Sequence, residues 1–102
     1  MNDLLELLKQ LNIAVAYHHF VNPNSPPFIT YLGTGTDNFY ADNKVYLKIN
    51  IIKIELYTLQ KDIKLESQLE SILDSNEIPY EIIAEGYIES EKVYQVIYEI
   101  NI

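Results

Sequence analysis

Residues 44–57 read KVYLKINIIKIELY, a run rich in β-branched and aromatic residues that is typical of one long strand. Its apolar residues occupy odd positions up to residue 51 and even positions from residue 52 to residue 56. Since successive side chains point to opposite faces of a strand, the apolar face changes midway. Either a bulge near Asn50 inserts one extra residue, or the strand begins outside the core and enters it midway.

One helix and two strands are predicted on the C-terminal side of this run. The helix covers residues 62–76, with Asp62 as its N-cap, and Leu65, Leu69, Ile72 and Leu73 form its apolar face. Segments 80–88 and 93–102 are rich in strand-forming residues, and apolar and polar residues alternate in the second. The four residues between them, Glu-Ser-Glu-Lys, join the two strands.

On the N-terminal side the pattern predicts a helix and two more strands. Leucines at helical spacing mark a helix that ends near Asn12, with Asp3 as its cap and Glu6 completing a capping box. Strands follow over 13–20 and 28–32, separated by a proline-rich loop. Residues 33–43, GTGTDNFYADN, are predicted to form a long loop.

The expected order is therefore helix, three strands, helix and two strands. This order indicates an α+β fold with a mainly antiparallel sheet and two helices packed on one face. We expect the core to hold Leu4, Leu8, Leu11, Ile54, Leu56, Leu65, Leu69, Ile72, Val96 and Tyr98.

The amino-acid composition limits the kinds of protein to which this chain can belong. A length of 102 residues is that of one domain, spanning 1–102. The net charge is −8, and none of the seven basic residues is arginine, unlike a typical nucleic-acid binder. The lack of cysteine excludes disulfides and thiolate metal sites. With only short apolar runs and no signal-peptide pattern, we expect a soluble, cytoplasmic protein that binds neither nucleic acid specifically nor membranes.

Catalytic and metal-binding patterns are weak. Adjacent strand residues such as His18 and His19 are expected to point to opposite faces, which does not suit joint binding of one ion. The glycine-containing run after residue 32 lacks the ending of a phosphate loop. A hydrolase that uses Asp37 or Asp42 with His18 is the weakest alternative. We therefore expect no enzyme activity, no cofactor and no metal.

The charge is unevenly distributed along the chain. Residues 1–54 hold four acids and four lysines, whereas residues 55–102 hold eleven acids and three lysines. On the second helix Glu66, Glu70 and Asp74 stand four residues apart and share one face. Such an acidic stripe is either a solvated face or a surface that repels DNA or binds a basic partner.

Several segments of the chain resemble a family of small structural proteins from long-tailed bacteriophages and prophages of low-GC Gram-positive bacteria. These proteins act as tail completion, tail terminator or head–tail joining proteins. The resemblance covers nearly the whole chain, and the run Asp-Asn-Phe-Tyr-Ala-Asp-Asn at 37–43 is its most specific part. It rests on the leucine-rich opening helix and on segments 15–20, 26–32, 37–46, 54–58, 87–90 and 93–99.

The resemblance implies a non-enzymatic subunit of the virion tail, made in the host cytoplasm. Such subunits form a ring, typically a hexamer, at the head-proximal end of the tail tube, where they contact the major tail tube protein and the head connector. A ring of this kind often closes only on the tube end, which is consistent with a monomer in isolation. DNA would pass through the ring, which makes an acidic surface without arginine intelligible. The alternative is a small, non-catalytic ligand-binding domain or a regulatory domain that mimics nucleic acid.

For ring contacts we expect two oppositely charged patches and an aromatic loop. A basic patch with Lys44, Lys48 and Lys53, of which Lys44 and Lys48 share strand parity, would face the acidic stripe of a neighbouring copy. Phe39 and Tyr40 stand beside Asp37 and Asn38 in the predicted loop, and either fold back onto the core or contact a partner. The predicted interface residues are Asp37, Asn38, Phe39, Tyr40, Lys44, Lys48, Glu66, Glu70 and Asp74.

Overall fold

The computed structural model describes residues 2–20, 24–36, 39–41, 44–47 and 49–102. Two helices and seven strands follow one another along this part of the chain. They are α1 (Asn2–Lys9), β1 (Ala14–Tyr17), β2 (Phe28–Thr36), β3 (Phe39–Ala41), β4 (Lys44–Leu47), β5 (Asn50–Thr58), α2 (Ile63–Ser75), β6 (Tyr80–Ile88) and β7 (Val93–Asn101).

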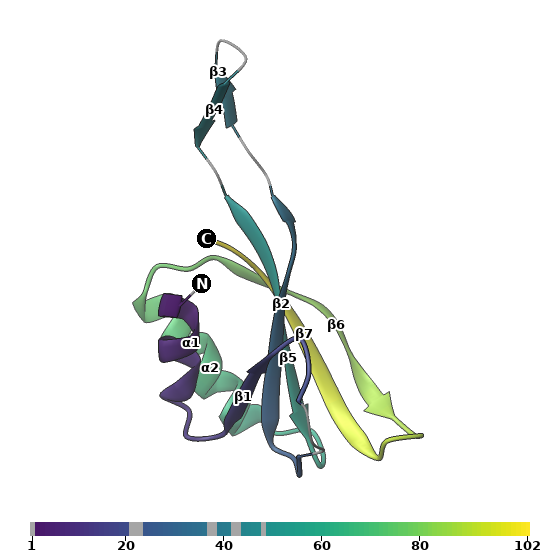
Figure 1. Cartoon of the computed structure of the whole chain (residues 1–102). Helices are drawn as coiled ribbons and strands as arrows, with labels where there is room; N and C mark the ends of the chain where they lie inside the picture. Colours follow the sequence, from purple (N-terminus) through teal and green to yellow (C-terminus); the bar gives the residue numbers. More distant parts are fainter. Residues whose placement is uncertain (1, 21–23, 37–38, 42–43, 48) are drawn as a thin grey trace.

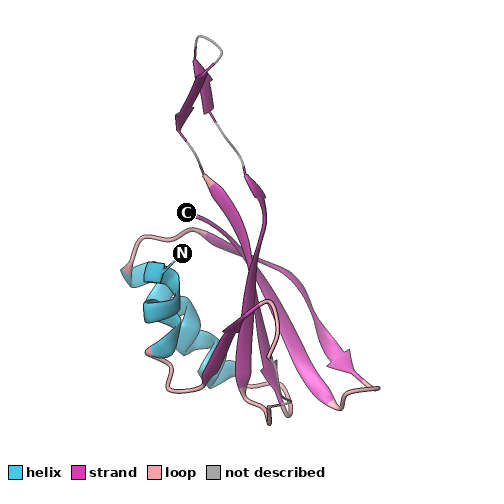
Figure 2. Cartoon of the chain, viewed as in Figure 1, coloured by secondary structure: helices cyan, strands magenta, loops and turns pink. Residues whose placement is uncertain are grey.

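Five of the strands form one sheet in the order β1-β2-β5-β7-β6. The pair β1 and β2 is parallel, and the other neighbours are antiparallel. Both helices lie on the same side of this sheet (Figure 2). The expected α+β fold, with a mainly antiparallel sheet and helices on one face, is confirmed. We call the sheet and its two helices the body, and the sheet face away from the helices the open face.

The core lies between the helices and one face of the sheet. Ile52, Ile54 and Leu56 of β5 point into it at every second position, as a half-buried strand requires. Leu69 and Tyr98 both belong to this core cluster and are fully buried. Eight of the ten predicted core residues are buried, whereas Leu11 and Ile72 are only half-buried at the rim of the helix layer.

A second, two-stranded sheet projects from the body. Strands β3 and β4 pair with each other, and Figure 1 shows them beyond the ends of β2 and β5, pointing away from the helices. We call this hairpin the arm. The radius of gyration is 14.8 Å, against about 13 Å for a compact domain of about 100 residues, in keeping with this projection.

The arm corrects two sequence predictions. Residues 33–43 are not one long loop, because Gly33–Thr36 extend β2 and Phe39–Ala41 form β3. The run at 44–57 is two strands, one in the arm and one in the body. The apolar face changes because the chain begins outside the core and enters it midway, which was the second explanation. The bulge beside β5 lies between Gly33 and Gly35 of β2, not at Asn50.

The sequence predicted the N-cap of α2 correctly, but not the start of α1 or the end of β1. The side chain of Asp62 caps α2, where its Oδ1 accepts a hydrogen bond from the backbone N–H of Leu65 at 3.0 Å. By contrast, α1 begins at Asn2, so Asp3 lies within its first turn and not before it. The strand predicted over 13–20 ends at Tyr17, because His18 adopts a left-handed φ of 68° that breaks the extended backbone.

Candidate interaction surfaces

The acidic stripe predicted on α2 is largely used inside the molecule. Glu66 is only 7% exposed, and its Oε1 accepts a hydrogen bond from Lys61 Nζ at 2.9 Å. The same ammonium group lies 2.7 Å from Glu85 Oε2 on β6. Lys61 therefore joins the start of α2 to the edge of the sheet, and Glu66 is a buried, paired carboxylate, not part of a solvated acidic face.

The next carboxylate of the stripe, Glu70, accepts hydrogen bonds from two tyrosines of the sheet. Tyr98 donates to it at 2.9 Å and Tyr80 at 3.4 Å. Burial of Tyr98, followed by its hydrogen bond to Glu70, raises the pKa of that phenol well above its ordinary value. Of the three predicted stripe residues Asp74 alone is exposed, so the stripe does not form a free acidic surface.

The predicted basic and aromatic residues belong to the arm and to the segments beside it. Lys44 begins β4 and is paired in register with Ala41, and Phe39 and Tyr40 belong to β3. Asp37, Asn38 and Lys48 lie outside the described residues, as do the side chains of Phe39, Tyr40 and Lys44. The structure thus places part of this group on one projecting hairpin, away from the stripe on α2 (Figure 1).

The open face carries a hydrogen-bonded cluster around Glu55. Thr30 Oγ1 donates to Glu55 Oε1 at 3.2 Å, and the Tyr57 hydroxyl donates to Glu55 Oε2 at 3.3 Å. Gln95 Nε2 contacts both Glu55 Oε2 at 3.3 Å and the Tyr57 oxygen at 2.9 Å. Burial, then the Glu55 charge, raises the pKa of Tyr57. Sequence reasoning missed this cluster, because its four members come from β2, β5 and β7.

Beside this cluster lies an aromatic groove of about 480 Å³. The Phe28 ring stacks on Tyr57 at 4.8 Å and meets Phe20 edge-on at 5.5 Å. His18 and His19 line the same groove, with their Nδ1 atoms 2.9 Å apart. The expectation that these rings point to opposite faces is wrong, because a three-residue turn at His18 replaces the strand. In the described segments no group of three His, Cys, Asp or Glu side chains is arranged to hold a metal ion.

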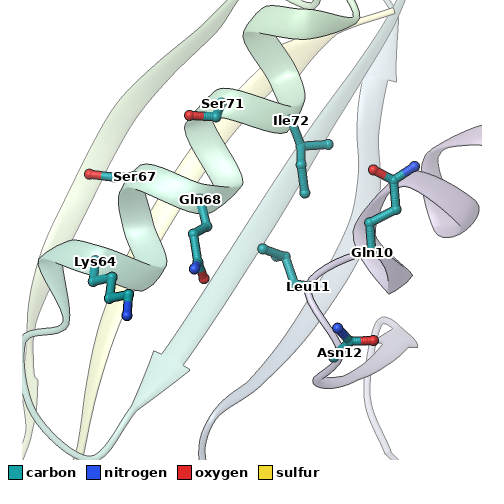
Figure 3. Close-up of a pocket in the computed structure, with 8 residues that line it drawn as sticks. All are labelled: Gln10, Leu11, Asn12, Lys64, Ser67, Gln68, Ser71 and Ile72. Carbon is teal, nitrogen blue, oxygen red and sulfur yellow. The ribbon is translucent and has the colours of Figure 1, made fainter.

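A second hollow, of about 580 Å³, lies between the end of α1 and the side of α2. Leu11 and Ile72 face one another across it (Figure 3), which explains why these two predicted core residues are only half-buried. Its other lining residues are polar, and one of them, Lys64, is charged. This hollow contains none of the residues predicted from the sequence to act in binding.

The edge strand β6 exposes three large apolar side chains. Ile82, Ile83 and Tyr87 are 46%, 42% and 48% exposed. A bulge between Ile82 and Ala84 reverses the alternation, so Glu81 and Glu85 lie on opposite faces although they share sequence parity. Sequence reasoning placed this strand correctly, but neither its edge position nor its bulge has a signal in the local pattern.

None of the helices in the described part of the chain is long and apolar enough to cross a membrane. Comparison with known proteins gave no family model and no curated protein that matches this sequence.

Proposed function

We propose that this chain is a non-enzymatic structural subunit of a bacteriophage tail. It acts in tail completion or head–tail joining, as one member of a ring at the head-proximal end of the tail tube. The family resemblance of segments such as 37–46 supports the proposal. Under it, the chain contacts the major tail tube protein and the head connector in the assembled virion.

The projecting arm supports this proposal in addition to the resemblance. The arm extends from the body without packing on it, and the longest dimension of the molecule is 50 Å against 27 and 23 Å. An isolated two-stranded hairpin is marginally stable in water, so an arm of this kind is most useful when it lies against another subunit. A subunit whose projecting elements are completed by neighbours suits ring assembly better than it suits an enzyme.

The charge of the chain is compatible with a position in a ring at the head-proximal end of the tail tube. A net charge of −8 without arginine gives DNA phosphates little to bind, so a ring of such subunits would let DNA pass. The aromatic groove between Phe20, Phe28 and Tyr57 favours the alternative, a small-ligand-binding domain. Deletion of the protein distinguishes the two functions: loss of a tail subunit should alter the tails, whereas loss of a ligand-binding domain should not.

The test is a phage or prophage in which the coding sequence is deleted and then supplied in trans. Electron microscopy of the deletion is expected to show tails of abnormal length or tails that do not join heads, with heads and tail tubes otherwise formed. Antibody labelling of complemented particles should mark the head-proximal end of the tail. Particles of normal length and normal joining in the deletion would contradict the proposal.

A further inference from the structure

Strand β6 is an edge that nothing covers in the described part of the molecule. It is the last strand of the five-stranded sheet and pairs with β7 on one side. The strand is nine residues long, contains neither lysine nor proline, and exposes Ile82, Ile83 and Tyr87. Natural proteins protect such edges with charged residues, proline, bulges or a covering element, and β6 has two glutamates and the bulge between Ile82 and Ala84. The glutamates repel a second acidic strand but leave the edge open to a basic one.

The arm also has strand edges that lack a pairing partner. Within the described residues, β3 and β4 pair with each other and with no other strand, which leaves each with a free backbone edge. Adding a third strand is what gives a hairpin independent stability. Figure 1 shows the arm pointing away from the body, so the strand that completes it belongs to another molecule.

The charges of the two segments are opposite. Residues 76–91, which include β6, contain five glutamates and no lysine. Residues 43–54 contain three lysines and no acid, and two of these lysines, Lys44 and Lys48, stand at the start of β4 and directly after it. Oppositely charged strands that meet side by side attract and fix each other's register.

We propose that strand β4 in the arm of one copy adds to the edge of strand β6 in a second copy. The pairing itself concerns this chain alone. Its place in a ring rests on the proposed function, which this contact deepens. It uses two different surfaces of each subunit, so repetition generates a ring or a filament. It also replaces the acidic partner expected from the sequence: the lysines meet β6, because Glu66 and Glu70 are already bonded within the subunit.

Charge decides between the possible occupants of the β6 edge. Two β6 edges paired with each other would bring Glu81 and Glu85 of both copies together, which is unfavourable. The opposite edge of the sheet, β1, carries no charged residue and offers no attraction to an acidic strand. The arm has lysines at β4 and a need for a further strand, so it fits best.

The structure suggests an armless variant for the test. Thr36 and Asn50 are directly paired across β2 and β5, so residues 37–49 can be replaced by Asn-Gly to close a two-residue hairpin. A second variant, Glu81→Lys with Ile83→Lys, keeps the arm and alters the exposed β6 edge. Its matched control is Asp74→Lys with Ile63→Lys, which adds the same charge to exposed positions of α2.

The experiment is a titration of the ¹⁵N-labelled armless variant, followed by amide NMR, which detects contacts as weak as about 1 mM. Adding the unlabelled α2 control variant, which keeps the arm, is expected to shift the amides of β6. Unlabelled armless protein, which has no arm to offer, should shift nothing. Low salt should tighten the contact. Placing Lys44→Glu with Lys48→Glu in the added α2 control variant should weaken the contact at least about tenfold. The unlabelled β6 variant has an intact arm but an altered edge of its own, so it should bind at least as tightly as the α2 control.

Absence of shifts on β6 at about 1 mM protein overturns the proposal. So do shifts centred on β1, on the aromatic groove or on α2, or a dimer that persists in armless protein alone. If the armless variant does not fold, the full-length chain replaces it: its self-association must then be lost in Lys44→Glu with Lys48→Glu and restored when Glu81→Lys is added. No phage component is present, so this result is independent of the deletion experiment on tails.

Discussion

Helix α2 and strand β6 each carry acidic residues four positions apart, and the folded protein uses the two glutamates of α2 and Glu81 of β6 in opposite ways. On α2, Glu66 and Glu70 are drawn into the molecule, where a lysine and two tyrosines satisfy them. On β6, Glu81 is exposed and makes no side-chain hydrogen bond or ion pair within the described residues, while Glu85 is tied to Lys61 and Tyr94. Acidic periodicity alone therefore does not identify a binding surface. A carboxylate is available to a partner only where no donor of its own chain reaches it.

The contrast depends on α2 being firmly packed, and Leu69→Ala should break that packing. Leu69 is fully buried on the apolar face of α2, so its truncation loses transfer free energy and leaves a cavity. We expect the free energy of unfolding to fall by about 2–5 kcal/mol in urea denaturation. Ile63→Ala on the same helix, where the side chain is 69% exposed, is the control and should change it by under about 0.5 kcal/mol. An equal response of the two variants would refute this account of the core.

The second prediction compares one carboxylate from each region. Glu70→Ala removes the acceptor of the buried Tyr98 hydroxyl, which should cost about 1–3 kcal/mol of unfolding free energy. Glu81→Ala should stay within about 0.5 kcal/mol, because this exposed residue lies opposite Glu99 and loses only a like-charge neighbour. Chemical denaturation of both variants measures the difference. Similar costs at the two positions would show that the two acidic groups do not differ.

Alkaline pH sharpens the same comparison. The pKa of Tyr98 is raised by burial and by Glu70, so above about pH 10 the unfolded chain loses this proton while the folded chain retains it. The unfolded state then binds fewer protons, and stability falls as pH rises. Thermal unfolding between about pH 8 and about pH 11 should show this fall. Tyr98→Phe should make this fall shallower, because the variant lacks the raised phenol.

The smallest expected effect concerns the link between the two regions. The Lys61 ammonium group, and then the Tyr94 hydroxyl, lower the pKa of Glu85 below its ordinary value of 4.5. The contacts of Glu85 with Lys61 and Tyr94 therefore stabilise the folded state above about pH 4.5. This stabilisation is lost as the pH falls through the lowered pKa of Glu85 in the folded protein. An NMR titration of the Glu85 carboxyl should give a higher pKa in Lys61→Met than in the unaltered protein. An unchanged pKa would mean that the two groups are not paired in solution.

The elements themselves were largely predictable from the sequence. Helix α2 with its Asp62 cap and strands β6 and β7 lie within one or two residues of their predicted bounds. Most of the core was also predicted, since burial follows the helical and alternating periods directly. These features depend on residues close together in the chain, which is why a single sequence contains them.

The candidate surfaces were less predictable. His18 and His19 lie together because of one turn at a left-handed residue, and the Glu55 cluster joins three strands that are distant in sequence. The bulge in β6 reverses the faces of Glu81 and Glu85 without any local sign. Each of these features depends on register or on backbone conformation, which a residue pattern does not contain.

By itself the sequence determined the α+β class, the strands and helices of the body, and the acidic character of its second half. Those properties follow from local propensity, apolar periodicity and charge counts. Only the tertiary structure decided that residues 39–41 and 44–47 form a projecting pair of strands, that α2 keeps its glutamates for internal donors, and that β6 is an edge. The physical reason is that pairing partners come from distant segments, and a shift of one residue exchanges the two faces of a strand.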